Sequence, residues 1–187
     1  MRSESQKAAM FAHSEQRADT SLTQTSDGVN GLTSVPALLQ RNAAEFGDKA
    51  AYREKDLGIW QNWTWSEAAD EIDALALGLL TLGAAEGDFI AIIGRNRPYL
   101  YWAMVAVQSV GAVPVPLYSD ASADEMAYVL DRCGAPFVLA ADQEQVDRVT
   151  DVQEGLSQFG QMIYPDPRGL RNADHANLHH VSNVEHA

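Results

Sequence analysis

The sequence predicts an α/β fold: an open, mostly parallel sheet with flanking helices, plus a small β-hairpin near the N-terminus. Short apolar runs of strand length alternate with segments of helical periodicity along most of the chain. One unit is complete, because the apolar run Phe89–Ile93 is followed by a helical segment from Pro98 and by a second apolar run at residues 112–117. Two strands joined by a helix favour parallel pairing with a right-handed crossover. The pattern does not give the strand order.

The chain begins with a polar segment that precedes the first predicted helix. Residues 1–31 are rich in Ser, Thr and Gln and predict a disordered tail, with a short helix near residues 6–11. Ser34 is expected to cap a helix that runs through Ala44 and ends at Gly47. The organised domain is therefore expected over residues 32–187.

A hairpin is predicted after this helix. The runs at residues 50–53 and 59–63 have strand character, and the residues 54–58 between them end in a glycine. Gly58 is expected to supply the backbone angle that the turn requires.

Two capping boxes mark the starts of later helices. Thr64 with Glu67, and Ser122 with Glu125, place a hydroxyl residue three positions before a glutamate. The apolar positions expected to face the core are Ala68, Ile72, Leu75, Leu79 and Leu82 in the first helix, and Met126, Val129 and Leu130 in the second. The carboxylates of the first helix lie largely off this face and indicate a solvated first turn rather than a metal cluster.

The central strand–helix–strand unit carries more specific signals. Asn96 is expected to cap its helix, and Gly111 to end it in the left-handed conformation. Residues 99–110 are apolar nearly all round, which predicts burial on several sides and a larger assembly than a four-stranded sheet. Pro114 and Pro116 remove two N–H groups from one side of a strand, which places that strand at the border of the sheet or near a crevice.

The C-terminal half continues the alternation of strands and helices. A third strand is predicted at residues 136–140, a helix at residues 143–154 and a fourth strand at residues 162–164. The segment from Pro165 onward is expected to be a loop.

Composition excludes several classes of protein. The net charge of −13 argues against binding to nucleic acid or to anionic membrane surfaces. No apolar stretch is long enough to span a membrane, and no export signal is visible. Cys133 is the single cysteine, which excludes an intrachain disulfide and is interpreted as structural rather than catalytic. A cytoplasmic location is expected.

Candidate ligand-binding residues lie after two of the predicted strands. Arg95, Asn96 and Arg97 follow the strand Phe89–Ile93, where a helix N-terminus could receive an anion. Tyr118 and Ser119 follow the next strand, at the end where open α/β sheets bind ligands. The alternative is an ordinary pair of surface loops.

No catalytic residue and no metal site is predicted. His175 and His179 are four residues apart and would share one face of a helix, but no third ligand is set by their spacing. No P-loop, dinucleotide fingerprint or nucleophile elbow occurs in the chain.

Three stretches resemble the adenylate-forming enzymes, most closely the AMP-forming long-chain acyl-CoA synthetases. Residues 62–67 (NWTWSE) with the helix after them look like the first N-terminal motif of that superfamily. Residues 107–117 (VQSVGAVPVPL) look like the second, and residues 164–171 (YPDPRGLR) are similar to a segment of the long-chain branch. The match covers residues 34–187 in unbroken order.

The resemblance implies a parent reaction in which a fatty acid, ATP and CoA give acyl-CoA, AMP and pyrophosphate. It implies ATP, Mg²⁺ and CoA as cofactors of the parent enzyme and a fatty acid as its substrate. The family's phosphate loop, its adenine and ribose motifs and its mobile C-terminal domain with the catalytic lysine are absent from these 187 residues. The chain is therefore expected to be a partial AMP-binding-type domain, truncated before the phosphate loop, that binds no cofactor alone.

Three functional hypotheses remain open at this point. The first is an inactive fragment of a fatty acid–CoA ligase, and the second is an interaction module that docks on a synthetase or on the missing remainder. The third is an independent small-ligand-binding domain. Self-association is an additional expectation, because a partial sheet exposes its edge.

Overall fold

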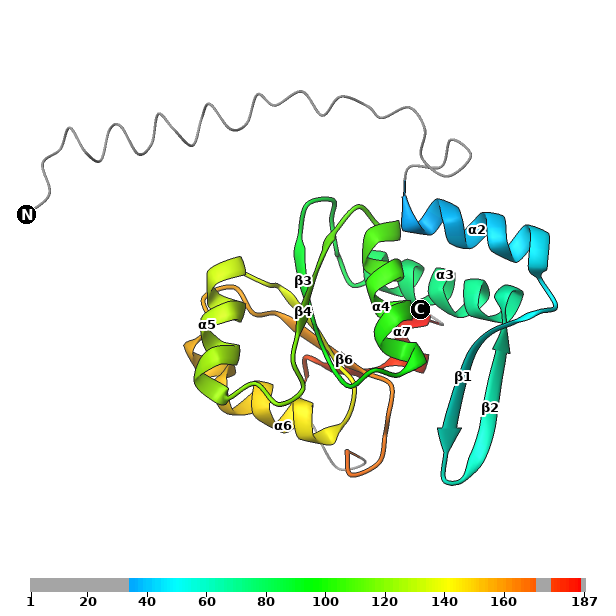
Figure 1. Ribbon diagram of the computed structural model, residues 1–187. Helices are drawn as coiled ribbons and strands as arrows, with labels where there is room; N and C mark the ends of the chain where they lie inside the picture. Colours follow the sequence, from blue (N-terminus) through cyan, green and yellow to red (C-terminus); the bar gives the residue numbers. More distant parts are fainter. Residues whose placement is uncertain (1–33, 171–175, 186–187) are drawn as a thin grey trace, which may run out of the picture. The chain divides into compact units, whose positions relative to one another are not determined.

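The structure, a computed structural model, describes residues 34–170 and 176–185. The predicted tail of residues 1–31 and its short helix lie outside the described residues. The described part begins with helix α2 (Val35–Phe46) and ends with helix α7 (Val181–Glu185), as Figure 1 shows.

The centre of the fold is a five-stranded parallel sheet in the order β4-β3-β5-β6-β7. Its strands are β3 (Phe89–Ile93), β4 (Val113–Leu117), β5 (Phe137–Ala140), β6 (Gln161–Tyr164) and β7 (Leu178–His180). The four strands predicted from the sequence are confirmed, and a fifth is added. Strand β4 forms one border, as its prolines predict. Val113 N donates to Asp88 O at 2.8 Å, so Pro114 and Pro116 turn their nitrogens away from β3.

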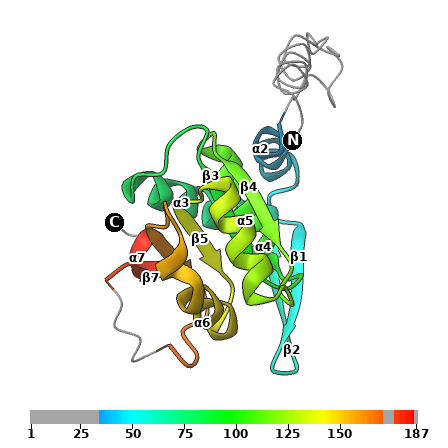
Figure 2. The ribbon, with the colours of Figure 1, turned by 90° about the vertical axis from the view of Figure 1, so that its left-hand side faces the viewer.

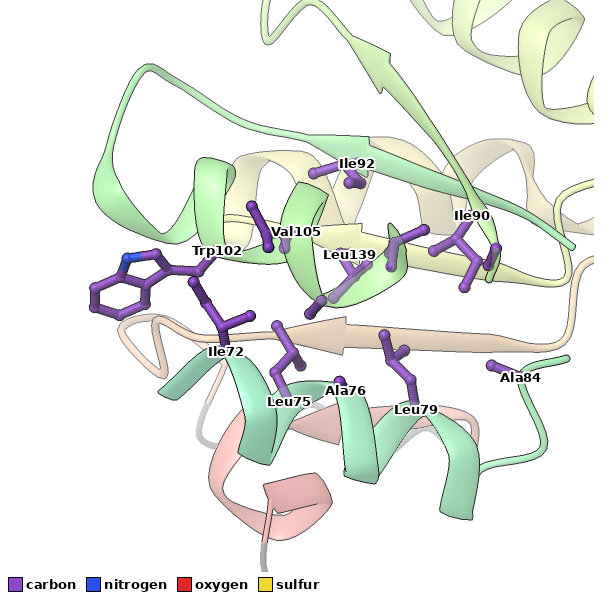
Figure 3. Close-up of a cluster of buried hydrophobic side chains, with 14 of the residues drawn as sticks. Ile72, Leu75, Ala76, Leu79, Ala84, Ile90, Ile92, Trp102, Val105 and Leu139 are labelled. Carbon is purple, nitrogen blue, oxygen red and sulfur yellow. The ribbon is translucent and has the colours of Figure 1, made fainter. Parts of the chain in front are cut away.

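Helices cover both faces of the sheet, and each face has its own core. The helices around it are α3 (Trp65–Thr81), α4 (Pro98–Ser109), α5 (Ala123–Cys133) and α6 (Gln143–Val152). Ile90, Ile92 and Leu139 pack toward α3 and α4, as Figure 3 shows, whereas Ala91 and Val138 pack toward α5 and α6. Figures 1 and 2 show the same division of the helices between the two sides.

The chain itself surrounds helix α4. This helix contacts α2, α3, β1, β3 and β4, and Ala103 and Val107 are fully buried. The Trp102 ring meets the Trp63 ring edge-on at 5.3 Å and the Tyr52 ring at 5.9 Å. The hairpin and α3 therefore already cover much of this helix within the chain itself.

The hairpin consists of β1 (Ala50–Asp56) and β2 (Ile59–Thr64), paired antiparallel. Its turn is only two residues long, since Leu57 and Gly58 both have positive φ, at 48° and 85°. Two such residues form the type I′ turn that matches the twist of a hairpin. The special role of Gly58 is confirmed, but the first strand extends three residues further than predicted.

Both predicted capping boxes are present. Thr64 Oγ1 accepts from Glu67 N at 3.2 Å, and Glu67 Oε2 accepts from Thr64 N at 2.8 Å. Ser122 and Glu125 make the same pair of bonds at the start of α5. Helix α2 begins at the predicted cap, because Ser34 Oγ accepts from Ala37 N, and it ends two residues later than predicted.

The segment predicted as a C-terminal loop contains structure. Strand β7 pairs with β6, and α7 packs on α3, where Val184 is buried. A Cβ at Gly78 of α3 would lie 2.5 Å from the Val184 carbonyl oxygen, so only glycine allows the two helices to approach this closely. A three-residue strand and a five-residue helix are too short for their periodicity to be recognised.

Candidate functional site

An open hollow lies at the carboxyl ends of β3 and β4. Its volume is about 500 Å³. The loop after β3 forms one wall, and the end of β4 with the loop after it forms the other. The structure therefore brings together four of the five residues predicted from the sequence, namely Arg95, Asn96, Tyr118 and Ser119. Loops at this edge of a parallel sheet are the usual ligand-binding loops of α/β folds.

Asn96 lines this hollow. The prediction that it caps the following helix is wrong. The N-cap of α4 is Arg97, and its side chain makes no capping hydrogen bond. Asn96 Oδ1 instead accepts a hydrogen bond of 2.8 Å from the Tyr101 hydroxyl. Pro98 starts the helix without an N–H group, which reduces the number of donors that a cap has to satisfy.

Arg97, the fifth predicted residue, faces a second hollow of about 480 Å³. This hollow lies between the hairpin, the loop after β3 and the loop after β6. It lies at the carboxyl ends of the neighbouring strands β3 and β5. The chain runs from β3 through α4 to β4 on one side and from β5 through α6 to β6 on the other, so this position is the topological switch point of the sheet. Arg97 Nη1 pairs with Glu54 Oε1 of the hairpin at 3.1 Å.

A second arginine crosses the same hollow. Arg168 Nε lies 2.8 Å from each carboxylate oxygen of Asp166, and Arg168 Nη1 is 3.8 Å from Asp56 Oδ1 on the hairpin. Hydrogen bonds from this guanidinium hold the pKa of Asp166 below its usual value, and the same bonds raise the pKa of Arg168. The YPDPRGLR segment thus links the end of β6 to the hairpin.

The charges of the second hollow balance one another. Each of its carboxylates, Glu54, Asp56 and Asp166, has an arginine within 4 Å. Within residues 34–170 and 176–185, no group of three or more His, Cys, Asp or Glu side chains could hold a metal ion. The charged side chains of this hollow are therefore engaged mainly with one another.

The remaining reactive side chains lie apart from the two hollows. Cys133 ends α5, where partial burial raises the pKa of its thiol, and its Sγ contacts Leu130 O at 3.6 Å. His179 Nε2 lies 2.6 Å from Gln161 Oε1, and His180 Nδ1 lies 2.7 Å from Ser182 Oγ. His175, which precedes His179 by four residues, lies outside the described residues.

Sequence reasoning did not place the hairpin charges at this edge of the sheet. Glu54 and Asp56 appeared to belong to a turn, and nothing in their spacing indicates contact with Arg97 and Arg168, which are 43 and 112 positions away in the chain. The Asp-Pro-Arg order within YPDPRGLR was an available signal, because an acidic and a basic residue two positions apart can form a bidentate pair that fixes a loop.

A family model described as AMP-binding enzyme matches residues 39–183. A long-chain-fatty-acid–CoA ligase of Mycobacterium tuberculosis, FadD15, is 32% identical over 131 residues, which is 69% of this chain and 22% of that protein. The uncharacterized protein Rv1549 of the same organism is 33% identical over 117 residues, 63% of this chain and 65% of its own length. The chain thus spans about a fifth of the length of the curated ligase.

Solved structures give the same fold. A putative long-chain-fatty-acid CoA ligase from Rhodopseudomonas palustris has a TM-score of 0.68 and 24% identity, covering 81% of this chain and 36% of that one. The N-terminal subdomain of Klebsiella oxytoca NpsA has a TM-score of 0.54 and 29% identity, covering 60% of this chain and 28% of that one. None of the helices in the described part of the chain combines the length and apolarity needed to cross a bilayer.

Proposed function

The chain belongs to the AMP-binding enzyme family, and from this premise we propose that it corresponds to the N-terminal part of the α/β domain of an ATP-dependent fatty acid–CoA ligase. The parent reaction would join a fatty acid to CoA with conversion of ATP to AMP and pyrophosphate. A cytoplasmic setting is part of this proposal.

One observation carries the proposal. The family match extends from residue 39 to residue 183, and the identity to a long-chain ligase reaches 32% over 131 residues. The parallel sheet and the hairpin agree with it in fold. Fatty acids are the substrates in the names of two of these relatives, and this supports the substrate class for the parent enzyme.

We propose further that the 187-residue chain does not catalyse adenylation alone. The loop after β3 contains a single glycine, Gly94, and offers no glycine-rich cradle for phosphates. The carboxylates beside it are paired with arginines, so no free pair is left to hold Mg²⁺. ATP, Mg²⁺ and CoA are therefore assigned to the parent enzyme and not to this chain.

Fatty-acid-dependent exchange between ATP and pyrophosphate tests this proposal. The purified chain is assayed with fatty acids of short to long chain length, and the M. tuberculosis ligase serves as positive control under the same conditions. No exchange above the no-enzyme background is expected. Exchange that depends on the fatty acid would refute the proposed inactivity and would require a nucleotide site near Gly94.

A second candidate function is a non-catalytic module that docks on a synthetase or on the complementary part of one. Exposed apolar side chains near the β4 border favour it. Phe89 at the start of β3, Val113 at the start of β4 and Tyr128 on α5 are each more than 40% exposed. Co-purification with the separately expressed remainder of a ligase tests it. Failure of the two chains to co-purify at micromolar concentration would count against docking.

A further inference from the structure

Two side chains of α6 converge on one carbonyl group of the loop after β4. Gln145 Nε2 donates to Ser119 O at 3.2 Å, and Arg148 Nη1 donates to the same oxygen at 2.9 Å. Arg148 Nη1 also donates to Ala121 O at 3.1 Å. Within the loop, Ala121 N donates to Tyr118 O at 3.1 Å. The carbonyl groups of Tyr118, Ser119 and Ala121 therefore all accept hydrogen bonds. The backbone of residues 118–121 is therefore fixed at several points.

The side chains of this loop point elsewhere. Tyr118 is 84% exposed, and both Tyr118 and Ser119 line the hollow of about 500 Å³. A loop with a fixed backbone and free side chains presents those side chains in one arrangement, which reduces the entropy lost when a ligand binds.

Helix α6 also reaches the opposite wall of the hollow. Glu144 Oε1 accepts a bond of 2.7 Å from Arg148 Nη2, and Glu144 Oε2 lies 3.8 Å from Arg95 Nη2 on the loop after β3. The two walls of the hollow are thus connected through three residues of α6, namely Glu144, Gln145 and Arg148, and none of the three lines the hollow itself.

The chemistry of Gln145 indicates a positioning role. Its side chain is fully buried, and within the described part of the chain its Oε1 has no hydrogen-bond partner. A buried amide with one unpaired oxygen is costly, and an apolar side chain of similar size would fill the same space without that cost. The bond to Ser119 O is the contact that such an apolar residue cannot make.

We propose that Gln145 and Arg148 are positioning residues that hold the loop of residues 118–121, and so set the spacing of the hollow between Ser119 and Arg95. The inference deepens the proposed function, and it rests on that function only for what the hollow receives. The hydrogen bonds on which the inference rests are present in the chain without a ligand.

Amide hydrogen exchange of the 187-residue chain, followed by NMR, tests this proposal. The reporter is the Ala121 amide, which is hydrogen-bonded within the loop. Gln145→Met is expected to speed its exchange about tenfold, because one hydrogen bond is lost, and Arg148→Met is expected to speed it further. Arg148→Lys keeps one charged donor and should restore part of the protection.

Thr150→Val serves as the matched control. Thr150 is on the same helix, and its hydroxyl donates only within that helix, to Val146 O at 2.8 Å. Unchanged exchange at Ala121 in both methionine variants would overturn the proposal. A uniform rise in exchange over α6 and α5, with equal loss of protection in Thr150→Val, would also overturn it, because the side chains would then support only the helix. The ATP–pyrophosphate assay is independent of these measurements, so failure of the proposed function is recognised separately.

Discussion

Replacing Gly78 by alanine tests the packing of the C-terminal helix α7 on α3. A Cβ at this position would clash with Val184 Cγ1 and would lie 2.5 Å from Val184 O. Ordinary contacts begin near 3.4 Å, so α7 would have to move by about 1 Å. A rotation of the valine side chain relieves the first contact but not the second, because the second involves the backbone.

Two effects of opposite sign act on this variant. Alanine in place of a helical glycine stabilises a helix by about 1 kcal/mol. Overpacking costs about 1–3 kcal/mol, and detachment of α7 would expose Val184 at a cost of about 2 kcal/mol. We therefore expect Gly78→Ala to lower the free energy of unfolding by about 1 kcal/mol, which corresponds to a fall in Tm of about 2–4 °C.

Urea unfolding followed by tryptophan fluorescence measures the effect. Leu77→Ala is the control, because Leu77 is the neighbouring residue of α3 and is 64% exposed, so its truncation should change stability by less than about 0.5 kcal/mol. Adding Val184→Ala to Gly78→Ala should recover only part of the loss, since the carbonyl contact remains. A Gly78→Ala variant more stable than the parent chain would show that helix propensity outweighs packing and that α7 does not lie against Gly78.

Three further predictions concern the helix caps, the acid response and the thiol. Thr64→Ala and Ser122→Ala should each lower the free energy of unfolding in urea by about 1 kcal/mol. The two losses should add in the double variant, because the caps lie on opposite sides of the sheet, and marked non-additivity would contradict their independence. Hydrogen bonds from the N-caps hold the pKa values of Glu67 and Glu125 below their ordinary value in the folded chain. The stability that they contribute is therefore present above the ordinary glutamate pKa and is lost as the pH falls through the lowered one. Replacing both by glutamine should flatten the acid limb of a curve of unfolding free energy against pH, and an unchanged limb would refute this. Burial raises the pKa of the Cys133 thiol, so iodoacetamide should alkylate the folded chain at pH 8 more slowly than it alkylates free cysteine. In urea the two rates should be similar. Equal rates for the folded chain and free cysteine would show an accessible thiolate.

The parts of the fold that sequence predicted are those with strong local signals. The Thr64 and Ser122 caps, the strand Phe89–Ile93 and the border position of β4 each follow from residues that lie next to one another in the chain. Proline was the most informative residue, because a missing donor excludes a central strand whatever the tertiary context.

The parts that sequence missed depend on distant contacts. Strand β7 has three residues and is recognisable only through its pairing with β6. The burial of α4 depends on Trp63 and Tyr52 from the hairpin, and apolar composition alone could not show whether this chain or another covers the helix. The rule that ligands bind at the carboxyl ends of parallel strands singled out Arg95, Asn96, Tyr118 and Ser119 as candidates. The structure added that they line one hollow and that α6 anchors the loop of residues 118–121.

The border strand β4 has a consequence for how copies of this chain meet. Its outward side carries the carbonyl groups of Pro114 and Pro116 but no N–H group at either position. A strand from a second molecule needs both donors and acceptors in alternation, so it would find only half of its bonds there. The opposite border, β7, is three residues long and offers little length for pairing. Growth of the sheet from molecule to molecule is disfavoured at both ends, and whatever covers Phe89 and Val113 must do so with side chains rather than with another strand.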